Sequence, residues 1–257
     1  MKSIPVLLLA SSLILISSLS SAQVPQVQQR PPDGGTREVL VSILIPSLPN
    51  APFTATVNAE WKRQLADGTT ITLGNRRAIA RDKWGRIFQE RRVLVPQDVK
   101  QESVVAQIEI SDPISHKLYT CVPNERVCQL ELFSEPVFVP PAKAGTENAS
   151  RQPGSPTVED LGKQSVGGLE TVGTREIMFI ETGAMGNDSP MLIKREFWYS
   201  PRLGVNLISK VQDPRFGTQN FEVSEIALGD PDPNLFQLPS NASVIDLRKP
   251  VKVTSPH

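Results

Sequence analysis

The sequence has few of the residues that carry most enzymatic and metal chemistry. Among 257 residues there are two histidines and two cysteines. No Gly-x-Ser-x-Gly, His-Glu-x-x-His or phosphate-binding glycine loop occurs in the chain. His257 is the last residue, and a hydrolase would need polar side chains around His116 in a pocket. We therefore predict a protein that is not an enzyme and that carries no catalytic residues, no metal ion and no cofactor.

An excess of charge of either sign is also lacking. Lys and Arg number 27, and Asp and Glu number 27 as well. A balanced chain has no general attraction to nucleic acids or to anionic membrane surfaces. We therefore expect no nucleic-acid partner.

Long apolar runs are confined to the first residues of the chain. Lys2 precedes an apolar run over residues 4–16, and the small residues Ser20 and Ala22 come before Gln23. This pattern predicts a cleavable signal peptide at 1–22, and the alternative is an uncleaved N-terminal anchor. The run is shorter than the roughly 20 apolar residues of a spanning helix. We expect a periplasmic or secreted protein that does not span the membrane after cleavage.

The two cysteines, Cys121 and Cys128, lie in a segment that is symmetric about Asn124-Glu125. A hairpin folded at that point places the two cysteines opposite each other, at a Cα separation of about 4.5–5.5 Å that suits a disulfide. Export supplies an oxidising compartment. The alternatives are a redox pair or half of a metal site, but the spacing is not Cys-x-x-Cys. We predict a structural disulfide.

Proline is abundant, with 23 residues, which disfavours a helical fold because an interior proline breaks a helix. Short alternating segments separated by glycine-containing turns predict a mainly β protein, an antiparallel meander with few or no long helices. Between Val223 and Ile226 the apolar alternation changes phase, which indicates a β-bulge. The expected strands are 37–45, 53–64, 69–81, 86–95, 104–110, 117–122, 126–133, 169–181, 191–199, 205–212 and 218–228.

The expected organisation is a flexible leader at 23–36, one β domain at 37–242 and a C-terminal tail at 243–257. Within the domain, residues 135–157 are rich in Pro and Gly. Segments of this length and composition are functional loops or linkers. We interpret this one as a mobile loop, and the alternative is an interdomain linker.

The C-terminal third combines the segment 196–201, turns at 200–204 and 213–217, and a tail with Pro233, Leu235, Phe236 and Pro239. In these residues it resembles secreted proteins related to the LolA/LolB-like outer-membrane lipoprotein carriers and to the sensor domains of periplasmic stress regulators. The resemblance covers residues 169–239, and residues 54–95 look similar to uncharacterised secreted bacterial proteins of the same kind. The resemblance implies a curved antiparallel half-barrel whose concave face holds an acyl chain or a peptide.

Two groups of side chains are candidates for binding. Met191, Ile193, Phe197 and Tyr199 alternate along one predicted strand and would line an apolar wall of such a half-barrel, the alternative being an ordinary core. Arg76, Arg77, Arg91 and Arg92 lie on one predicted hairpin. Pairing is expected to bring Arg77 near Glu90 and Arg76 near Arg91. Such facing cations would bind an anion or an acidic partner, unless they form a solvated face neutralised by Glu90 and Asp82.

These features predict an extracytoplasmic, non-catalytic binding protein that holds an apolar or amphiphilic ligand, such as a lipid, an acyl chain or a lipopeptide, in a half-barrel. The expected partners are a lipid or lipoprotein ligand. The alternative is an interaction or structural module of the envelope without a small ligand, in which the loop at 135–157 and the arginine hairpin contact an envelope protein.

Overall fold

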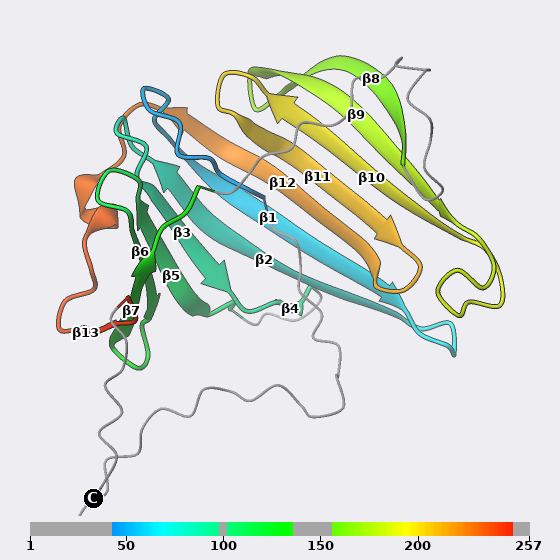
Figure 1. Ribbon diagram of the computed structural model, residues 1–257, viewed down its shortest axis with the longest axis horizontal. Helices are drawn as coiled ribbons and strands as arrows, with labels where there is room; N and C mark the ends of the chain where they lie inside the picture. The colour runs from blue at the N-terminus through cyan, green and yellow to red at the C-terminus, as the bar shows by residue number, and fades with distance from the viewer. Residues whose placement is uncertain (1–42, 98–101, 136–155, 249–257) are drawn as a thin grey trace, which may run out of the picture. The chain divides into compact units, whose positions relative to one another are not determined.

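The computed structural model describes residues 43–97, 102–135 and 156–248. The predicted signal peptide, the leader, almost all of the predicted loop at 135–157 and the end of the tail lie outside these ranges. The described residues form one 13-stranded sheet (Figure 1). Its strands are β1 Phe53–Gln64, β2 Thr70–Arg81, β3 Ile87–Arg92, β4 Val95–Pro96, β5 Val105–Asp112, β6 Lys117–Val122, β7 Val127–Leu132, β8 Thr157–Val166, β9 Leu169–Ile180, β10 Met191–Ser200, β11 Val205–Asp213, β12 Gly217–Leu228 and β13 Ser243–Asp246.

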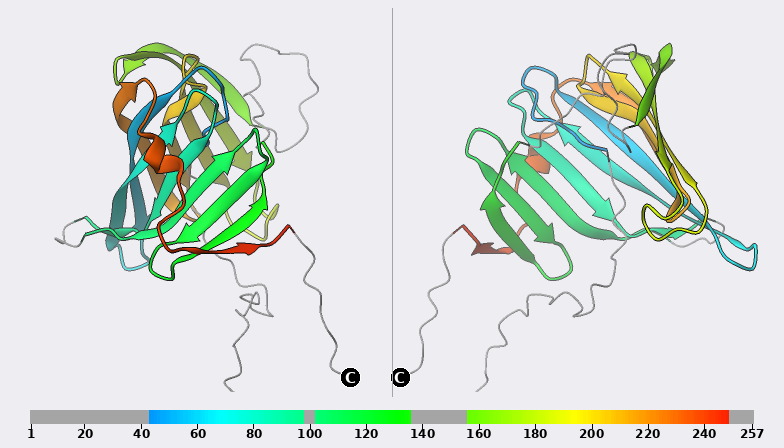
Figure 2. Two further views of the ribbon diagram at one scale, coloured as in Figure 1. Left: turned by 90° about the vertical axis from the view of Figure 1, so that its left-hand side faces the viewer. Right: turned by 45° about the vertical axis from the view of Figure 1, so that its right-hand side comes forward.

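The strands follow the order β13-β7-β6-β5-β3-β2-β1-β12-β11-β10-β9-β8, and β4 pairs with β2 off this path. From β7 to β8 in this order, adjacent strands are antiparallel, and the two halves of the chain join where β1 pairs with β12. The last strand, β13, is parallel to β7. The sheet is open and curved (Figure 2), so the predicted antiparallel half-barrel is confirmed.

Helix is scarce, as predicted. Within the described ranges, only the 3-10 turn η1 (Pro233–Phe236) is helical. No helix in those ranges is long and apolar enough to cross a membrane. Asp232 caps η1 by accepting a hydrogen bond from the Asn234 amide at 2.9 Å, which satisfies a donor that the first turn leaves open.

The predicted first strand is wrong in its described part. Residues 43–48 are not paired in the sheet, yet Ile43 and Ile45 are each 3% exposed and belong to the main hydrophobic core. β-branched apolar residues are favoured in strands because they fit a half-buried surface, and here the same side chains are buried by lying against the sheet. The strands β8 and β13 were not predicted. The sequence of β8, TVEDLGKQSV, is too polar to show a core-facing alternation.

The main core lies on one side of the sheet, which we call the core face. In β1 every second residue from Phe53 to Ala59 is buried, as expected for a strand with one face in a core. Ile79, Leu207 and Val223 from the neighbouring strands join them, and Ile43 and Ile45 pack onto the cluster. Burying a side chain of this size contributes about 1.5–3 kcal/mol, so this cluster holds β1, β2, β11 and β12 together.

The other side of the sheet, the opposite face, has a smaller core at its β2–β6 end. Ala80, Phe88 and Ile110 are buried there. The side chains that cover them include Leu235 and Phe236 of the 3-10 turn and Leu238 beyond it. The proline-containing tail on which the family resemblance partly rested therefore seals one end of the opposite face.

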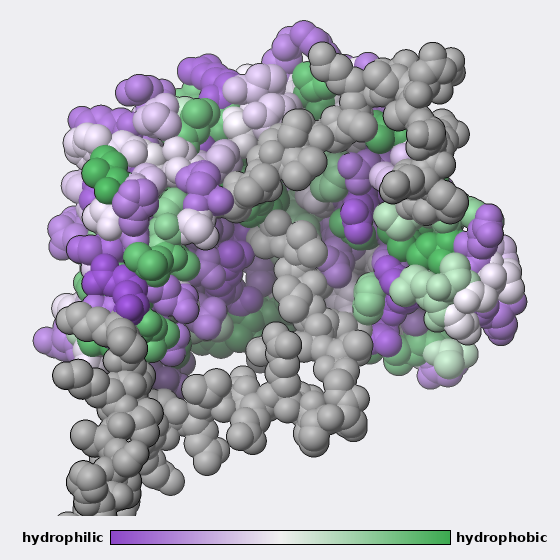
Figure 3. Space-filling model, in the orientation of Figure 1, coloured by the Kyte–Doolittle hydropathy of each residue, from purple (hydrophilic) through white to green (hydrophobic). Residues whose placement is uncertain are grey.

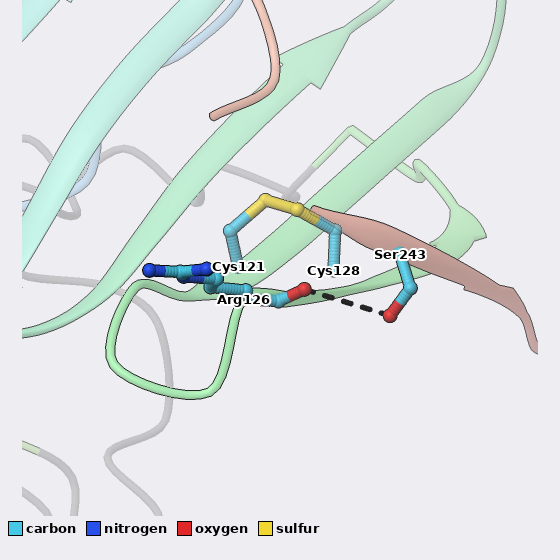
Figure 4. Close-up of a disulfide and its surroundings, with 4 residues drawn as sticks. All are labelled: Cys121, Arg126, Cys128 and Ser243. Atoms are coloured by element: carbon cyan, nitrogen blue, oxygen red, sulfur yellow. Dashed lines mark hydrogen bonds between the residues drawn. A yellow bond between two sulfur atoms is a disulfide. The ribbon is translucent and has the colours of Figure 1, made fainter. Parts of the chain in front are cut away.

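The predicted disulfide is present. Cys121 and Cys128 are directly opposed in β6 and β7, with an S–S distance of 2.05 Å and a Cα–Cα distance of 3.9 Å. The edge strand β13 begins beside this bond, where the Ser243 amide donates to the Arg126 carbonyl at 2.9 Å and the Ser243 hydroxyl donates to the same oxygen at 3.5 Å (Figure 4). Closing so short a loop stabilises the fold by about 2–3 kcal/mol in the chain-entropy account.

The predicted bulge is also present. The register of β1 on β12 shifts between Thr54 and Thr56, and Glu225 has a φ of 53°. Its carboxylate accepts hydrogen bonds from the Thr56 hydroxyl and the Arg76 guanidinium, both at 2.7 Å. These bonds hold the extra residue in a backbone conformation that L-residues rarely adopt.

Candidate functional site

The four candidate ligand residues lie on one side of β10. The pairing of β9 with β10 runs without a register shift from Met191 opposite Ile180 to Tyr199 opposite Val172, so alternate residues share a face. Phe197 pairs with Ser209 of β11, which pairs with Phe221 of β12. Because Phe221 belongs to the main core, this side of β10 is part of the core face.

We call this surface the apolar wall, formed by Val172, Met178, Ile180, Met191, Ile193, Phe197 and Tyr199. Ile193 is 3% exposed, whereas Met191, Phe197 and Tyr199 are half-buried. Hydrophobic residues gather over the β9–β10 hairpin in the space-filling view (Figure 3). An ion pair interrupts the wall between Ile193 and Phe197, where Arg195 and Glu176 approach within 3.9 Å. The wall is thus apolar at both ends and charged in the middle.

The arginine hairpin is paired one residue out of the predicted register. Ile79 lies opposite Gln89, and Arg81 lies opposite Ile87. The turn is built around Asp82, whose carboxylate accepts from the Trp84 amide at 3.0 Å and the Arg86 amide at 2.9 Å. Since side chains alternate between faces, this one-residue difference moves each arginine's expected neighbour to the other face.

The four predicted arginines therefore do not form one cluster. Arg76 pairs with Glu225 at 2.7 Å, on the opposite face. Arg92 pairs with Glu90 at 2.8 Å. The Arg91 guanidinium donates hydrogen bonds to both carboxylate oxygens of Glu109, at 3.0 and 2.8 Å. Arg77 is only 4% exposed.

Arg77 and Arg91 are neighbours on the core face. Burial and then the charge of Arg91 lower the pKa of Arg77 to about 10, while Glu109 and Glu90 oppose this shift. Two further polar side chains lie on this part of the sheet, and the buried Oδ1 atom of Asn75 and Oε1 atom of Gln89 have no hydrogen-bond partner among the residues that the structure describes. We call this surface the polar wall, formed by Asn75, Arg77, Gln89, Arg91 and Glu109.

The opposite face has a groove of about 770 Å³ over β1, β2, β11 and β12. Its polar lining is largely paired internally, since Glu60 accepts from Asn220 at 3.1 Å and from Gln97 at 3.3 Å. Hydrogen bonds from Lys62, Asn220 and Gln97 lower the pKa of Glu60. Sequence reasoning missed this groove because its residues come from strands that are far apart in the chain.

A metal site and a hydrolase centred on His116 both lack support in the described ranges. No cluster of three or more His, Cys, Asp or Glu side chains within those ranges could hold a metal ion. His116 is exposed in the turn between β5 and β6, with a φ of 52°. A hydrolase built on His116 required the side chain to lie in a pocket, and this position does not provide one.

Acid is expected to destabilise the protein partly through Asp213, an 8% exposed carboxylate on the core face. Arg215 donates to it at 2.6 and 2.9 Å, and these bonds hold the pKa of Asp213 below its ordinary value of 3.8. Its stabilising contribution is therefore complete above about pH 5 and is lost as the pH falls through 3.8 toward the lower folded-state pKa. Urea unfolding midpoints should fall less steeply below pH 4 in Asp213→Asn and in Arg215→Met than in the wild type. Equal acid slopes in all three proteins would contradict this assignment.

No family model and no curated protein matches the chain. Solved structures with some likeness include a chain of the Pseudomonas aeruginosa MucA/MucB complex, at 12% identity over 76% of this chain and 58% of that one, with a TM-score of 0.37. This chain thus spans less than two thirds of that protein's length. An uncharacterised conserved protein of Thermus thermophilus matches at 9% identity over 77% and 91% of the two chains, with a TM-score of 0.39.

The LolA superfamily protein NE2245 of Nitrosomonas europaea matches at 10% identity over 74% of this chain and 91% of that one, with a TM-score of 0.28. A LolA superfamily protein is thus among the structural neighbours. At these identities and TM-scores, no activity, ligand or partner of these proteins is transferred to this chain.

Proposed function

We propose that the protein is an extracytoplasmic, non-catalytic binding protein that holds an amphiphilic ligand on the core face of its half-barrel. The observation that supports this function is the division of one face into two walls of different chemistry. The apolar wall on β9–β10 offers half-buried Met191, Phe197 and Tyr199, which suit an acyl chain. The polar wall offers Arg91, whose side chain is 33% exposed and whose guanidinium group suits an anionic head group.

The separation of the walls agrees with the size of a lipid. β2 and β10 are four steps apart in the strand order, which corresponds to about 19 Å along the sheet. One leaflet of a bilayer's hydrocarbon core is about 15 Å thick, so an acyl chain with its head group reaches from one wall to the other.

Native mass spectrometry of the full chain, exported and purified from a bacterial envelope, is expected to show a co-purifying amphiphile. A fluorescent fatty acid should bind the same protein. The double variant Met191→Ser/Phe197→Ser should bind it at least about tenfold more weakly, since each substitution removes apolar contact surface. Leu192→Ser is the matched control, because Leu192 lies on the same strand but on the opposite face and is 41% exposed.

Arg91→Gln tests the head-group end of the site. It should weaken binding of the fatty acid more than binding of the corresponding alcohol, which lacks the carboxylate. If the native mass of the purified protein equals that of the polypeptide alone and the protein binds no fluorescent fatty acid, the proposed function is overturned. Equal losses in Leu192→Ser and in the double variant would contradict the proposed wall.

An envelope protein is the second candidate partner, favoured by the edge strand β8. Within the described ranges β8 pairs with β9 alone, so an extended segment of another protein could add to its free edge. Cross-linking in cells distinguishes the two functions. A specific protein partner that is lost on deletion of residues 136–156, with no bound amphiphile, would favour this second function.

A further inference from the structure

A row of polar side chains crosses the opposite face of the sheet, with one residue from each of six neighbouring strands. We call it the polar row, formed by Glu60, Asn220, Lys210, Glu196, Arg175 and Glu159. Each member is paired with the next in the register of the sheet, and the strands β1, β12, β11, β10, β9 and β8 lie side by side (Figure 1). Five steps of about 4.8 Å make the row about 24 Å long. Its members line the groove of about 770 Å³ and a second groove of about 420 Å³ over β8 to β11.

The side chains of the polar row are held in place by one another. Besides the bonds that Glu60 accepts, the Arg175 guanidinium donates to Glu196 at 3.1 Å and to Glu159 at 3.2 Å. The Lys210 ammonium lies 3.7 Å from the Glu196 carboxylate. The linings of the two grooves together contain five cations and five carboxylates. A surface whose charges balance in this way favours a neutral ligand with many hydrogen-bonding groups over an anion or a cation.

Trp198 adds a flat apolar surface beside the polar row. Its indole N–H donates to Glu196 at 3.0 Å. Its ring lies on Gly173 of β9, where a Cβ atom would be 2.6, 2.7 and 2.8 Å from three carbons of the ring. Gly162 of β8 is paired with Gly173, and a Cβ atom at Gly162 would meet nothing within 4 Å. The half-buried ring is therefore fixed in orientation, and the space next to it over β8 is open.

We propose that the polar row and Trp198 bind a neutral oligosaccharide chain. A pyranose ring carries hydroxyl groups around its edge and C–H groups on its two faces. One such face would stack on the Trp198 ring, whose negative face attracts C–H groups. The hydroxyl groups would exchange hydrogen bonds with the polar row, because its carboxylates accept and its amide, guanidinium and ammonium groups donate. The site lies on the opposite face, so sugar binding stands whether or not the core face holds an amphiphile.

The test is calorimetric titration of the full mature chain with three hexasaccharides: maltohexaose and N-acetylated chitohexaose, which are neutral, and hexagalacturonate, which is anionic. The wild type is expected to bind at least one neutral hexasaccharide more tightly than hexagalacturonate. A tenfold rise in salt should change that affinity by less than about twofold, because salt screens only charged groups. A preference between the two neutral sugars distinguishes a glucan from an amino-sugar glycan as the source of the ligand.

Two substitutions of Trp198 test the stacking surface. Trp198→Ala should weaken binding of the neutral hexasaccharide about tenfold or more, since it removes the flat ring. Trp198→Phe keeps an aromatic ring and should weaken binding by less.

Trp84→Ala is the matched control, because Trp84 is 51% exposed in the β2–β3 turn and lines neither groove. It should leave sugar binding unchanged, and thermal unfolding should confirm that all three variants fold. The proposal is overturned if the wild type binds neither neutral hexasaccharide, if hexagalacturonate binds as tightly as the better neutral one, or if Trp84→Ala loses as much binding as Trp198→Ala. Fatty-acid uptake measured on the same proteins should be equal in Trp198→Ala and the wild type, which separates a failure of sugar binding from a failure of the proposed function.

Discussion

Replacing Arg81 with methionine is expected to lower the free energy of unfolding by about 4 kcal/mol or more. Arg81 is 0% exposed. Its guanidinium donates to the Pro46 carbonyl at 2.8 Å, to the Ala51 carbonyl at 3.0 and 2.8 Å and to the Leu203 carbonyl at 2.7 Å. It also lies 5.1 Å from the centre of the Phe53 ring. One side chain thus ties the segment before β1 and the β10–β11 turn to strand β2.

The size of this effect follows from what the substitution leaves behind. Three carbonyl groups would lose a donor, and each unsatisfied buried polar group costs about 1–3 kcal/mol. Burial lowers the pKa of Arg81 to about 10, so the group is still charged at neutral pH and depends on these acceptors. Lysine keeps the charge, but its ammonium group lacks the planar fork that reaches all three carbonyls. Arg81→Lys should therefore be destabilised as well, by less than Arg81→Met.

Urea unfolding at pH 7 measures both variants. Arg76→Met is the matched control, since Arg76 lies on the same strand with a side chain that is 64% exposed. Its free energy of unfolding should change by no more than about 0.5 kcal/mol. Similar unfolding midpoints for Arg81→Met and Arg76→Met would show that Arg81 does not hold these segments together.

Gly217→Ala is expected to be the second strongly destabilising change. Gly217 has a φ of +88°, and a Cβ atom there would lie 2.2 Å from the Lys62 carbonyl oxygen and 3.2 Å from the Arg63 Cα. Both contacts are with backbone of β1, which cannot move without breaking the pairing of Lys62 with Thr218. We expect a loss of about 3 kcal/mol from this overpacking, in addition to the cost of a left-handed backbone.

Gly68 supplies the control for the backbone cost. Its φ is +85°, and a Cβ atom there would meet nothing within 4 Å. Gly68→Ala should therefore cost only about 1–2 kcal/mol, the penalty of the left-handed conformation for an L-residue. Unfolding of the two variants in urea isolates the steric effect as the difference between them. If they lose the same stability, the close approach of β1 to Gly217 has no energetic consequence.

Much of the local structure could be read from the chain. The symmetry about Asn124-Glu125 predicted the opposed cysteines because a short hairpin leaves few ways to pair. The alternation in β1 predicted its buried face, and the phase change after Val223 predicted the bulge. In each of these three cases, the residues that determine the structural feature lie within a few positions of it in the sequence. The missed strand β8 lacks such a signal, since at the sheet edge most of its side chains face solvent.

The candidate site was predictable only in part. Met191, Ile193, Phe197 and Tyr199 could be placed on one side of a strand, because alternation needs no knowledge of the partner strand. The register predicted for the arginine hairpin was wrong by one residue. The hydrogen bonds of Asp82 set that register within the turn, and one residue of difference placed Arg77 in the interior and Arg76 on the surface.

By itself, the sequence determined the mainly β class, the disulfide, most hairpins and the residues that share each face of a strand. Only the tertiary structure decided which strands become neighbours, because the pairing of β1 with β12 joins residues that are more than a hundred positions apart. That pairing places the apolar wall and the polar wall on the same face of one sheet. The face on which a side chain lies follows from its position in a two-residue alternation, which can be read from the sequence. The pairing of distant strands depends on how the whole core is buried, which the composition of the chain does not reveal.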